Sequence, residues 1–121
     1  MRNISATVFA AALLVGAASV EAAPSNSANP AYVGIWSVDA AKCKVPQDRQ
    51  GAPMILRRKR YDQHEAHCSF RSVRRSSNAW WVSAQCTVEG SKQSDRFTLR
   101  MKGDTLVMSH GKQSVSMKRC K

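Results

Sequence analysis

Seven basic residues gather in two neighbouring stretches of the chain, where together they could bind an anion. They are Arg57, Arg58, Lys59 and Arg60, followed by Arg71, Arg74 and Arg75. Because alternate side chains share a face on a strand, Arg57 would project with Lys59, or Arg58 with Arg60. Unpaired cations are costly to bury, so at least one of these pairs must lie at the surface or near an end of the fold. We expect a basic stripe that docks an acidic protein, lipopolysaccharide phosphates or an acidic glycan. The alternative is that the stripe provides only solubility and general attraction to an anionic envelope.

Two adjacent tryptophans, Trp80 and Trp81, follow this stripe and must face opposite ways if they lie on a strand. Trp80 shares its facing with the apolar Val82, so we expect Trp80 inside and Trp81 outside. An outward Trp beside arginines is typical of a contact anchor, because binding hot spots favour both residue types. Trp81 can equally be one half of an ordinary cross-strand pair.

No catalytic frame surrounds the titratable residues. The three histidines are His64, His67 and His110, and no Gly-x-Ser-x-Gly or comparable motif accompanies them. His64 and His67 stand three residues apart, a spacing that on a strand sends them to opposite faces, so a metal pair is not expected. The chain also lacks the Gly-x-x-x-x-Gly-Lys motif of phosphate-binding loops. We therefore expect no enzyme, no cofactor and no metal.

The amino-terminal region has the three-part layout of a secretory signal peptide. A basic start at Arg2 precedes an apolar run from Ile4 to Val20 and a segment of small residues. Cleavage after Ala22 fits best, so residues 1–22 are expected to be the signal peptide. The apolar run is shorter than the ~20 residues that a bilayer span needs, and we expect no transmembrane segment in the mature chain.

The exported part is expected to consist of a flexible segment, residues 23–31, and one domain, residues 32–121. Removal of the signal peptide takes away one cation and one anion and leaves the net charge of +11 unchanged. Such a charge would suit nucleic acid, but export argues against that partner. We expect the protein in the periplasm, or secreted from the cell.

Residues 32–121 alternate short β-prone runs with turn-forming residues, and no long stretch has the spacing of an amphipathic helix. The expected strands are Val33 to Val38, Met54 to Tyr61, His67 to Arg74, Ala79 to Val88, Ser94 to Met101, Thr105 to Ser109 and Gln113 to Arg119. The connection Ser76-Ser77-Asn78 and the later ones have hairpin length. With no helix to cover an apolar face, the sheet needs either closure into a barrel or a second sheet over it, and closure is the simpler solution. We predict an all-β fold, a small antiparallel up-and-down barrel of about seven or eight strands.

Four cysteines, Cys43, Cys68, Cys86 and Cys120, lie in the exported part, where disulfides form and persist. Pairing the two strands on either side of Ser77 sets Cys68 opposite Cys86, and Arg74 opposite Trp80. A Cys68–Cys86 bond leaves Cys43–Cys120 as the second bridge. Cys43–Cys68 with Cys86–Cys120 stays open as the alternative pairing. A four-cysteine zinc site is disfavoured, because no two cysteines stand at the Cys-x-x-Cys spacing.

Gly34-Ile35-Trp36 near the start of the domain and Lys118-Arg119 near its end resemble the Gly-x-Trp and terminal Arg/Lys signature of the calycin barrels. The resemblance implies a lipocalin-like barrel in which Arg119 lies across the Trp36 indole and closes one end through a cation–π contact. The alternative is that Trp36 is simply a core residue.

Two groups of exported bacterial proteins, inhibitors of lysozyme-type peptidoglycan hydrolases and inhibitors of secreted metalloproteases, are similar in size and cysteine content. The chain resembles the protease inhibitors from Gly34 to Cys43, and the lysozyme inhibitors from Cys86 to Gly90 and at Arg119-Cys120. In the lysozyme inhibitors a Ser/Gly-rich loop enters the hydrolase cleft, where a Ser and a Lys meet the catalytic carboxylates. The corresponding segment here is Ser109, His110, Gly111 and Lys112, without the family's fuller Ser-Gly-Ser-Gly motif and following Tyr.

The resemblance therefore implies a periplasmic inhibitor of a peptidoglycan hydrolase that acts by loop insertion. The alternatives are a binding module for anionic envelope material, such as a glycolipid, or for an acidic protein, and an inhibitor of a secreted protease.

Overall fold

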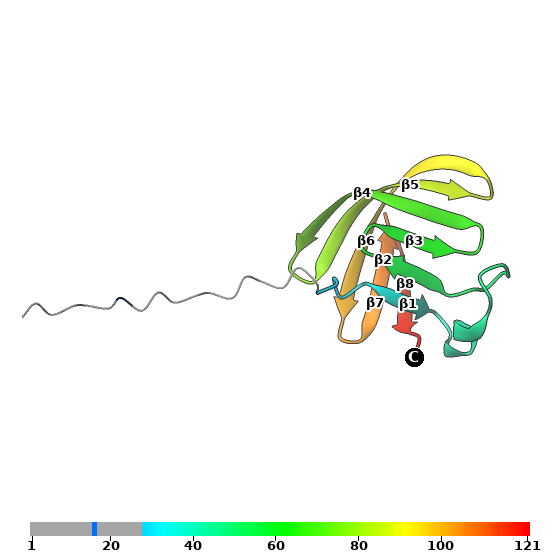
Figure 1. Cartoon of the computed structure of the whole chain (residues 1–121), viewed down its shortest axis with the longest axis horizontal. Coiled ribbons are helices and arrows are strands. Elements are labelled where there is room, and N and C mark those ends of the chain that lie inside the picture. The colour runs from blue at the N-terminus through cyan, green and yellow to red at the C-terminus, as the bar shows by residue number, and fades with distance from the viewer. Residues whose placement is uncertain (1–15, 17–27) are drawn as a thin grey trace, which may run out of the picture.

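Eight antiparallel strands close into a barrel in which each strand pairs with its sequence neighbours and the last strand pairs with the first (Figure 1). The computed structural model describes residue 16 and residues 28–121, so the expected signal peptide apart from residue 16, and most of the expected flexible segment, lie outside the described residues. The strands are β1 (Gly34–Ser37), β2 (Met54–Arg57), β3 (Arg60–Gln63), β4 (Ala66–Ser76), β5 (Ala79–Val88), β6 (Ser91–Lys102), β7 (Thr105–His110) and β8 (Gln113–Arg119). A short 3-10 helix, η1 (Ala40–Lys44), follows β1. The all-β barrel predicted from the sequence is confirmed. In the part of the chain that the structure describes, no helix has the length and apolar character needed to cross a membrane.

The run from Met54 to Tyr61, expected as one strand, folds instead as the β2–β3 hairpin. Arg58 and Lys59 form its two-residue turn, and Arg57 lies opposite Arg60. A single strand would have turned alternate cations of this run toward the core, whereas the turn leaves all four exposed. The expected pairs on shared strand faces, Arg57 with Lys59 and Arg58 with Arg60, are therefore wrong.

Inward-facing apolar side chains from all eight strands fill the barrel. Trp36, Leu99 and Leu106 are completely buried. Tyr32, just before β1, packs its ring edge-on against Trp80 with the two centroids 5.1 Å apart. Burial of each such side chain contributes about 1.5–3 kcal/mol. Because alternate residues of the long strands β4, β5 and β6 point inward, the residues between them form a continuous outer face.

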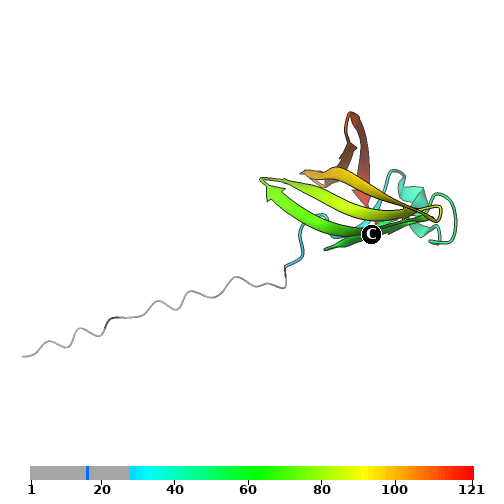
Figure 2. The ribbon, with the colours of Figure 1, turned by 90° about the horizontal axis from the view of Figure 1, so that it is seen from above.

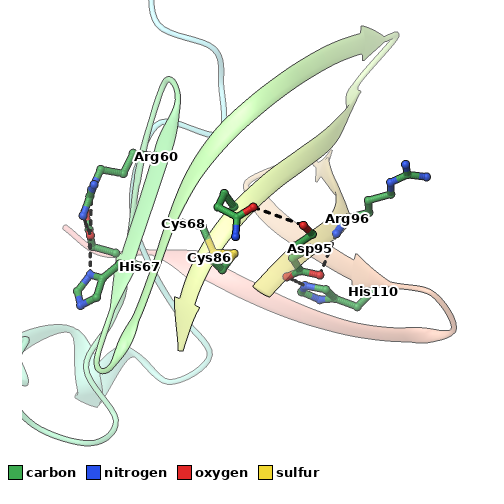
Figure 3. The surroundings of a disulfide bond; sticks show 10 residues. Arg60, His67, Cys68, Cys86, Asp95, Arg96 and His110 are labelled. Carbon is green, nitrogen blue, oxygen red and sulfur yellow. Dashed lines mark hydrogen bonds and ion pairs between the residues drawn. A yellow bond between two sulfur atoms is a disulfide. The ribbon is translucent and has the colours of Figure 1, made fainter. Parts of the chain in front are cut away.

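Both disulfides form in the favoured pairing. Cys68 and Cys86 lie opposite each other on β4 and β5 and are buried in the core (Figure 3). Cys43 in η1 is bonded to Cys120, just past β8, and this bond ties the long β1–β2 connection to the end of the domain. The alternative pairing is excluded. Two structural disulfides indicate an oxidising compartment outside the cytosol.

A short seam between β1 and β8 closes the barrel. The Arg119 guanidinium lies 4.3 Å from the centroid of the Trp36 ring. It also donates hydrogen bonds of 2.9 Å to the carbonyl oxygens of Ala31 and Val33. The contact that the calycin resemblance implies between Arg119 and Trp36 is thus present. The seam itself has only two residue pairs, Trp36 with Arg119 and Ser37 with Lys118.

Candidate anion-binding face

A β-bulge at Arg71 determines which side chains meet across the outer half of the β4–β5 hairpin. The register predicted from the cysteines holds as far as Phe70, beyond which it shifts by one residue. The hairpin turn has two residues, Ser77 and Asn78, in place of the expected three-residue connection, and the bulge absorbs the extra residue. The predicted pair of Arg74 with Trp80 is therefore wrong, and Arg74 lies opposite Trp81.

This register lines up four outward side chains across four strands. Arg74 of β4 lies opposite Trp81 of β5, which lies opposite Thr98 of β6. Thr98 in turn lies opposite Ser109 of β7. Trp81 is 57% exposed and Trp80 is 4% exposed, so the facing predicted for the two tryptophans is confirmed.

A groove of about 500 Å³ follows this row on the outside of the barrel. Its lining adds the Arg96 side chain from β6, the hydroxyl-bearing Ser72 and Ser83, and Gly111 from the β7–β8 turn. A second hollow of about 380 Å³ shares Ser83 and Arg96 with the groove and reaches Arg71, and its lining includes one acidic residue, Asp95, whose carboxylate contacts His110. Among the described residues, none of those that line the first groove is acidic. The surface therefore combines an exposed indole, guanidinium groups and hydroxyls.

Three guanidinium groups on this face have no acceptor within residues 28–121. Arg71, Arg74 and Arg96 make no side-chain hydrogen bond or ion pair there. In Figure 3 the Arg96 guanidinium points away from the contact between Asp95 and His110. Free guanidinium groups offer a planar fork of donors that matches phosphate and carboxylate oxygens. We call Arg71, Arg74, Arg96 and Trp81 the Trp81 face.

Arg75, which the sequence analysis grouped with Arg71 and Arg74, has partners of its own. Its Nε donates a hydrogen bond of 3.1 Å to the carbonyl oxygen of Ser77. Its guanidinium carbon lies 5.4 Å from the centroid of the Trp80 ring. Arg75 therefore helps to cover Trp80 at the hairpin end.

The basic run from Arg57 to Arg60 is largely satisfied within the fold. Asp62 of β3 accepts hydrogen bonds from Arg57 Nη1 at 2.6 Å and from Arg60 Nη2 at 2.8 Å. His67 Nδ1 lies 2.7 Å from Asp62 Oδ1. The hydrogen bond from Arg60 lowers the pKa of Asp62 to about 2, aided by His67 and opposed by partial burial. Arg58 donates to the side-chain oxygen of Asn29. This run is thus less available to a partner than the Trp81 face.

The Asp62 cluster makes stability dependent on pH in the acid range. Because the folded pKa of about 2 lies below the ordinary value of 3.8, ionised Asp62 stabilises the fold above about pH 4, and this contribution is lost as the pH falls toward 2. The partners Arg57, Arg60 and His67 are 57%, 49% and 51% exposed. Solvent screening therefore limits the contribution to about 1 kcal/mol.

We expect Asp62→Asn to lower the free energy of unfolding by about 1 kcal/mol at pH 6, and to have progressively less effect between about pH 4 and pH 2. Urea unfolding followed by circular dichroism at several pH values measures this difference. Asp48→Asn, which removes an exposed carboxylate without a side-chain partner in the described part of the chain, is the control. A difference between wild type and Asp62→Asn that stayed constant down to pH 2 would contradict the assignment.

The segment Ser109–Lys112 is more regular than a loop that inserts into a cleft. Ser109 and His110 are the last residues of β7, and only Gly111 and Lys112 form the turn. The Ser109 hydroxyl lies 2.8 Å from that of Ser114. His110 Nε2 lies 3.0 Å from Asp95 Oδ2, a contact drawn in Figure 3. Of the four predicted loop residues, Ser109 and Gly111 line the groove.

The structure thus brings together two sets of residues that the sequence analysis kept apart. Ser109 and Gly111 from the expected inhibitory loop share one groove with Arg74 and Trp81 from the expected docking stripe. Sequence reasoning missed Arg96, because its place beside Ser83 depends on the register of β5 and β6. The sequence did indicate that Arg96 faces outward, because it alternates with the inward-facing Asp95 and Phe97 along the expected strand.

Within residues 28–121, no three side chains among His, Cys, Asp and Glu come together as a metal site would require. A scan against protein-family models and searches of curated proteins and of solved structures found no match to this chain.

Proposed function

We propose that this chain is a non-enzymatic binding protein of the periplasm that holds a polyanionic component of the cell envelope on the Trp81 face. The observation that carries the proposal is the set of guanidinium groups of Arg71, Arg74 and Arg96, which have no acceptor in the described part of the chain, around a 57% exposed Trp81. Phosphate or carboxylate oxygens of the ligand would accept hydrogen bonds from these groups. The indole supplies apolar contact for the part of the ligand that carries the anions.

The shape of the surface also favours a ligand that lies along it. The groove of about 500 Å³ and the hollow of about 380 Å³ share Ser83 and Arg96, so they form a concave strip. A concave strip can accommodate an extended chain or a headgroup along its length, whereas insertion into the cleft of a folded enzyme requires a protruding surface. Phosphorylated glycolipid and acidic glycan have the required chemistry, and a net charge of +11 adds long-range attraction to both.

Neutralising Arg74 and Arg96 together is expected to weaken binding to lipopolysaccharide or to an acidic glycan by about thirtyfold. This estimate takes about 1 kcal/mol for each exposed charge-assisted contact. Binding of the wild type should also weaken by about tenfold or more between about 0.05 and 0.5 M NaCl, because salt screens exposed charges. Titration of immobilised ligand with the wild type and with Arg74→Gln/Arg96→Gln measures both effects.

The matched control is Lys44→Gln/Lys121→Gln, which removes two positive charges from exposed residues that do not line the groove. This variant should bind within about threefold of the wild type, since only the general attraction falls. Equal losses in the two double variants would show that net charge alone, and not the Trp81 face, attracts the ligand. Separate arms with lipopolysaccharide and with a phosphate-free acidic glycan distinguish the two sources of anion.

Inhibition of a peptidoglycan hydrolase is the second candidate, supported by the exposed turn of Gly111 and Lys112. Lys112 has no side-chain partner within residues 28–121, and the left-handed Gly111, at φ 56°, turns the chain tightly at the tip. An ammonium group at the tip of a hairpin suits a cleft lined by carboxylates. An acidic or bacterial hydrolase fits better than an animal lysozyme, because the latter is itself strongly basic. Undiminished cell-wall lysis in a turbidity assay with micromolar protein would refute this candidate, and azocasein digestion would separate it from inhibition of a secreted protease.

A further inference from the structure

The short strands β1 and β3 leave two lengths of strand edge uncovered. β3 pairs with residues 66–69 of β4, and β1 pairs with residues 118 and 119 of β8. In the part of the chain that the structure describes, residues 72–76 therefore pair with β5 alone, and residues 113–117 pair with β7 alone. In Figure 2 the β7–β8 hairpin rises away from the curved sheet of β4–β6, and one edge of this hairpin is the second uncovered length.

The two edges differ in how they are protected against pairing with another chain. The β4 edge carries the bulge at Arg71 and the cations Arg74 and Arg75, and proteins use both devices to block strand addition. Residues 113–117 read Gln-Ser-Val-Ser-Met, with no charge, no proline and no bulge. An uncharged, regular edge is the kind that accepts an added strand.

Backbone donors and acceptors at this edge can be assigned from the alternation of the ladder. The N–H of Cys120 donates to the carbonyl oxygen of Ile35, so the backbone polar groups of Cys120 face the β1 side. Because successive residues of a strand face opposite partners, the N–H and C=O groups of Ser116 and Ser114 face the same side. Both serines lie where β1 no longer follows β8, and both are exposed.

An apolar side chain accompanies these unpaired groups. Val115 lies opposite Met108, which is 3% exposed, and it shares the inward facing of Met117. Val115 is nevertheless 38% exposed, because no strand covers the β8 edge beside it. An added strand with an apolar side chain in register would cover Val115 and remove apolar area from water.

We propose that residues 113–117 of β8 accept an extended segment of an acidic partner protein as an additional antiparallel strand. Lys112, which has no side-chain partner within residues 28–121, stands at one end of this edge, where an acidic side chain of the segment would meet it. Lys118 at the other end already pairs with Asp104 at 3.1 Å, so the preference for an acidic segment rests on Lys112 and on the net charge of +11. A second copy of this chain is a poor occupant. It would bring a further net charge of +11 and, in symmetric pairing about Val115, would set Lys112 against Lys118. The edge adjoins the anion-binding groove, because Ser114 lies opposite the groove-lining Ser109, but the proposal does not depend on the proposed function.

Hydrogen exchange followed by NMR on the full exported chain tests the proposal directly. The probe is a seven-residue peptide that alternates Glu and Val and is blocked at both ends. The amide protons of Ser114 and Ser116 should exchange rapidly in the free protein and at least about tenfold more slowly in the complex. The amide protons of Val115 and Met117, which face β7, should be protected in both states and serve as internal controls. Slow exchange of Ser114 and Ser116 in dilute free protein would overturn the proposal, because the chain itself would then cover the edge. Slowing that depends on protein concentration would overturn it in favour of self-association.

A proline at Ser116 removes an edge N–H without taking a donor from the β7 ladder. Ser116→Pro should weaken peptide binding by about tenfold, the effect of one lost backbone hydrogen bond, whereas Ser116→Ala should bind as the wild type does. The proposal would be overturned if the Glu-Val peptide bound equally well to wild type and to Ser116→Pro. It would also be overturned if a Lys-Val peptide bound the wild type as tightly as the Glu-Val peptide does. If Ser116→Pro does not fold, as judged by circular dichroism, the exchange experiment on the wild type decides alone.

Discussion

Replacement of Cys43 and Cys120 together by alanine should lower the free energy of unfolding by about 4 kcal/mol. The bond between these residues spans 77 positions of the chain, and in the chain-entropy model closing a loop of that length restricts the unfolded state by about this amount. The same bond holds η1 against the end of β8, next to the two residue pairs that close the barrel. Its loss therefore acts where the fold has the least backbone pairing.

Urea unfolding of Cys43→Ala/Cys120→Ala, compared with the wild type under oxidising conditions, measures the loss. The other disulfide variant, Cys68→Ala/Cys86→Ala, is a poor control, because those cysteines are buried and their truncation also leaves a cavity. The better control is anion binding in the absence of urea. The groove lies on β4–β7 and the β7–β8 turn, away from Cys43 and Cys120, and Cys68–Cys86 still joins β4 to β5 in this variant, so Cys43→Ala/Cys120→Ala should bind as the wild type does. An unchanged unfolding midpoint would mean that the long crosslink does not restrict the unfolded chain.

The barrel was predictable because its determinants are local or follow a simple period. Alternation of apolar and polar residues, together with the two oxidised cysteine pairs, gave the antiparallel meander and the facing of Trp80 and Trp81. The Arg119–Trp36 closure followed from the resemblance of short motifs at the two ends of the domain. The pairing of Cys68 with Cys86 did depend on the length of the turn at Ser77, and it holds because the bulge at Arg71 compensates for the shorter turn.

The predictions failed where a single residue in a turn or bulge changed the register. Nothing in Arg57-Arg58-Lys59-Arg60 resembles a turn, since it contains no Gly, Asn, Asp or Pro. The segment nevertheless folds as a turn, because a continuous strand would direct alternate cations into the core at a large cost in free energy. Likewise the bulge at Arg71 moves Arg74 from Trp80 to Trp81, and with it the position of the whole outward row. The groove depends on three consecutive registers, so it could not be assembled from the sequence alone.

Whether each cation is free to bind a ligand likewise depends on which residues the turns and registers place beside it. Arg57 and Arg60 are brought by a hairpin turn to the one carboxylate of β3 that can satisfy them, Asp62. Arg74 and Arg96 stand beside hydroxyls and an indole, none of which neutralises a guanidinium. Three of the four cations in the most basic run of the sequence, Arg57, Arg58 and Arg60, thus already have partners within the fold. The three guanidinium groups that a ligand can use, those of Arg71, Arg74 and Arg96, come from β4 and β6, which are not adjacent in the barrel.

The second large effect is expected at Gly34, where Gly34→Ala should destabilise the fold by about 2 kcal/mol. A Cβ atom at this position would overlap Arg119 Nη1. The substitution therefore pushes the guanidinium off the Trp36 ring and away from the carbonyl oxygens of Ala31 and Val33. The estimate adds the lost cation–π contact to the lost charge-assisted hydrogen bonds.

A double-mutant cycle separates this mechanism from an intrinsic cost of alanine in the strand. In an Arg119→Ala background the added methyl group has no guanidinium to displace, so only the backbone cost of a side chain at φ 156° remains and Gly34→Ala should cost clearly less than in the wild-type background. Four urea unfolding curves, for the wild type, Gly34→Ala, Arg119→Ala and the double variant, give the coupling energy. Equal costs in the two backgrounds would mean that the glycine is required for its backbone and not for the close approach of Arg119. A large coupling would establish that one cation at the end of β8 specifies glycine 85 residues earlier in the chain, because both must fit over the same indole ring.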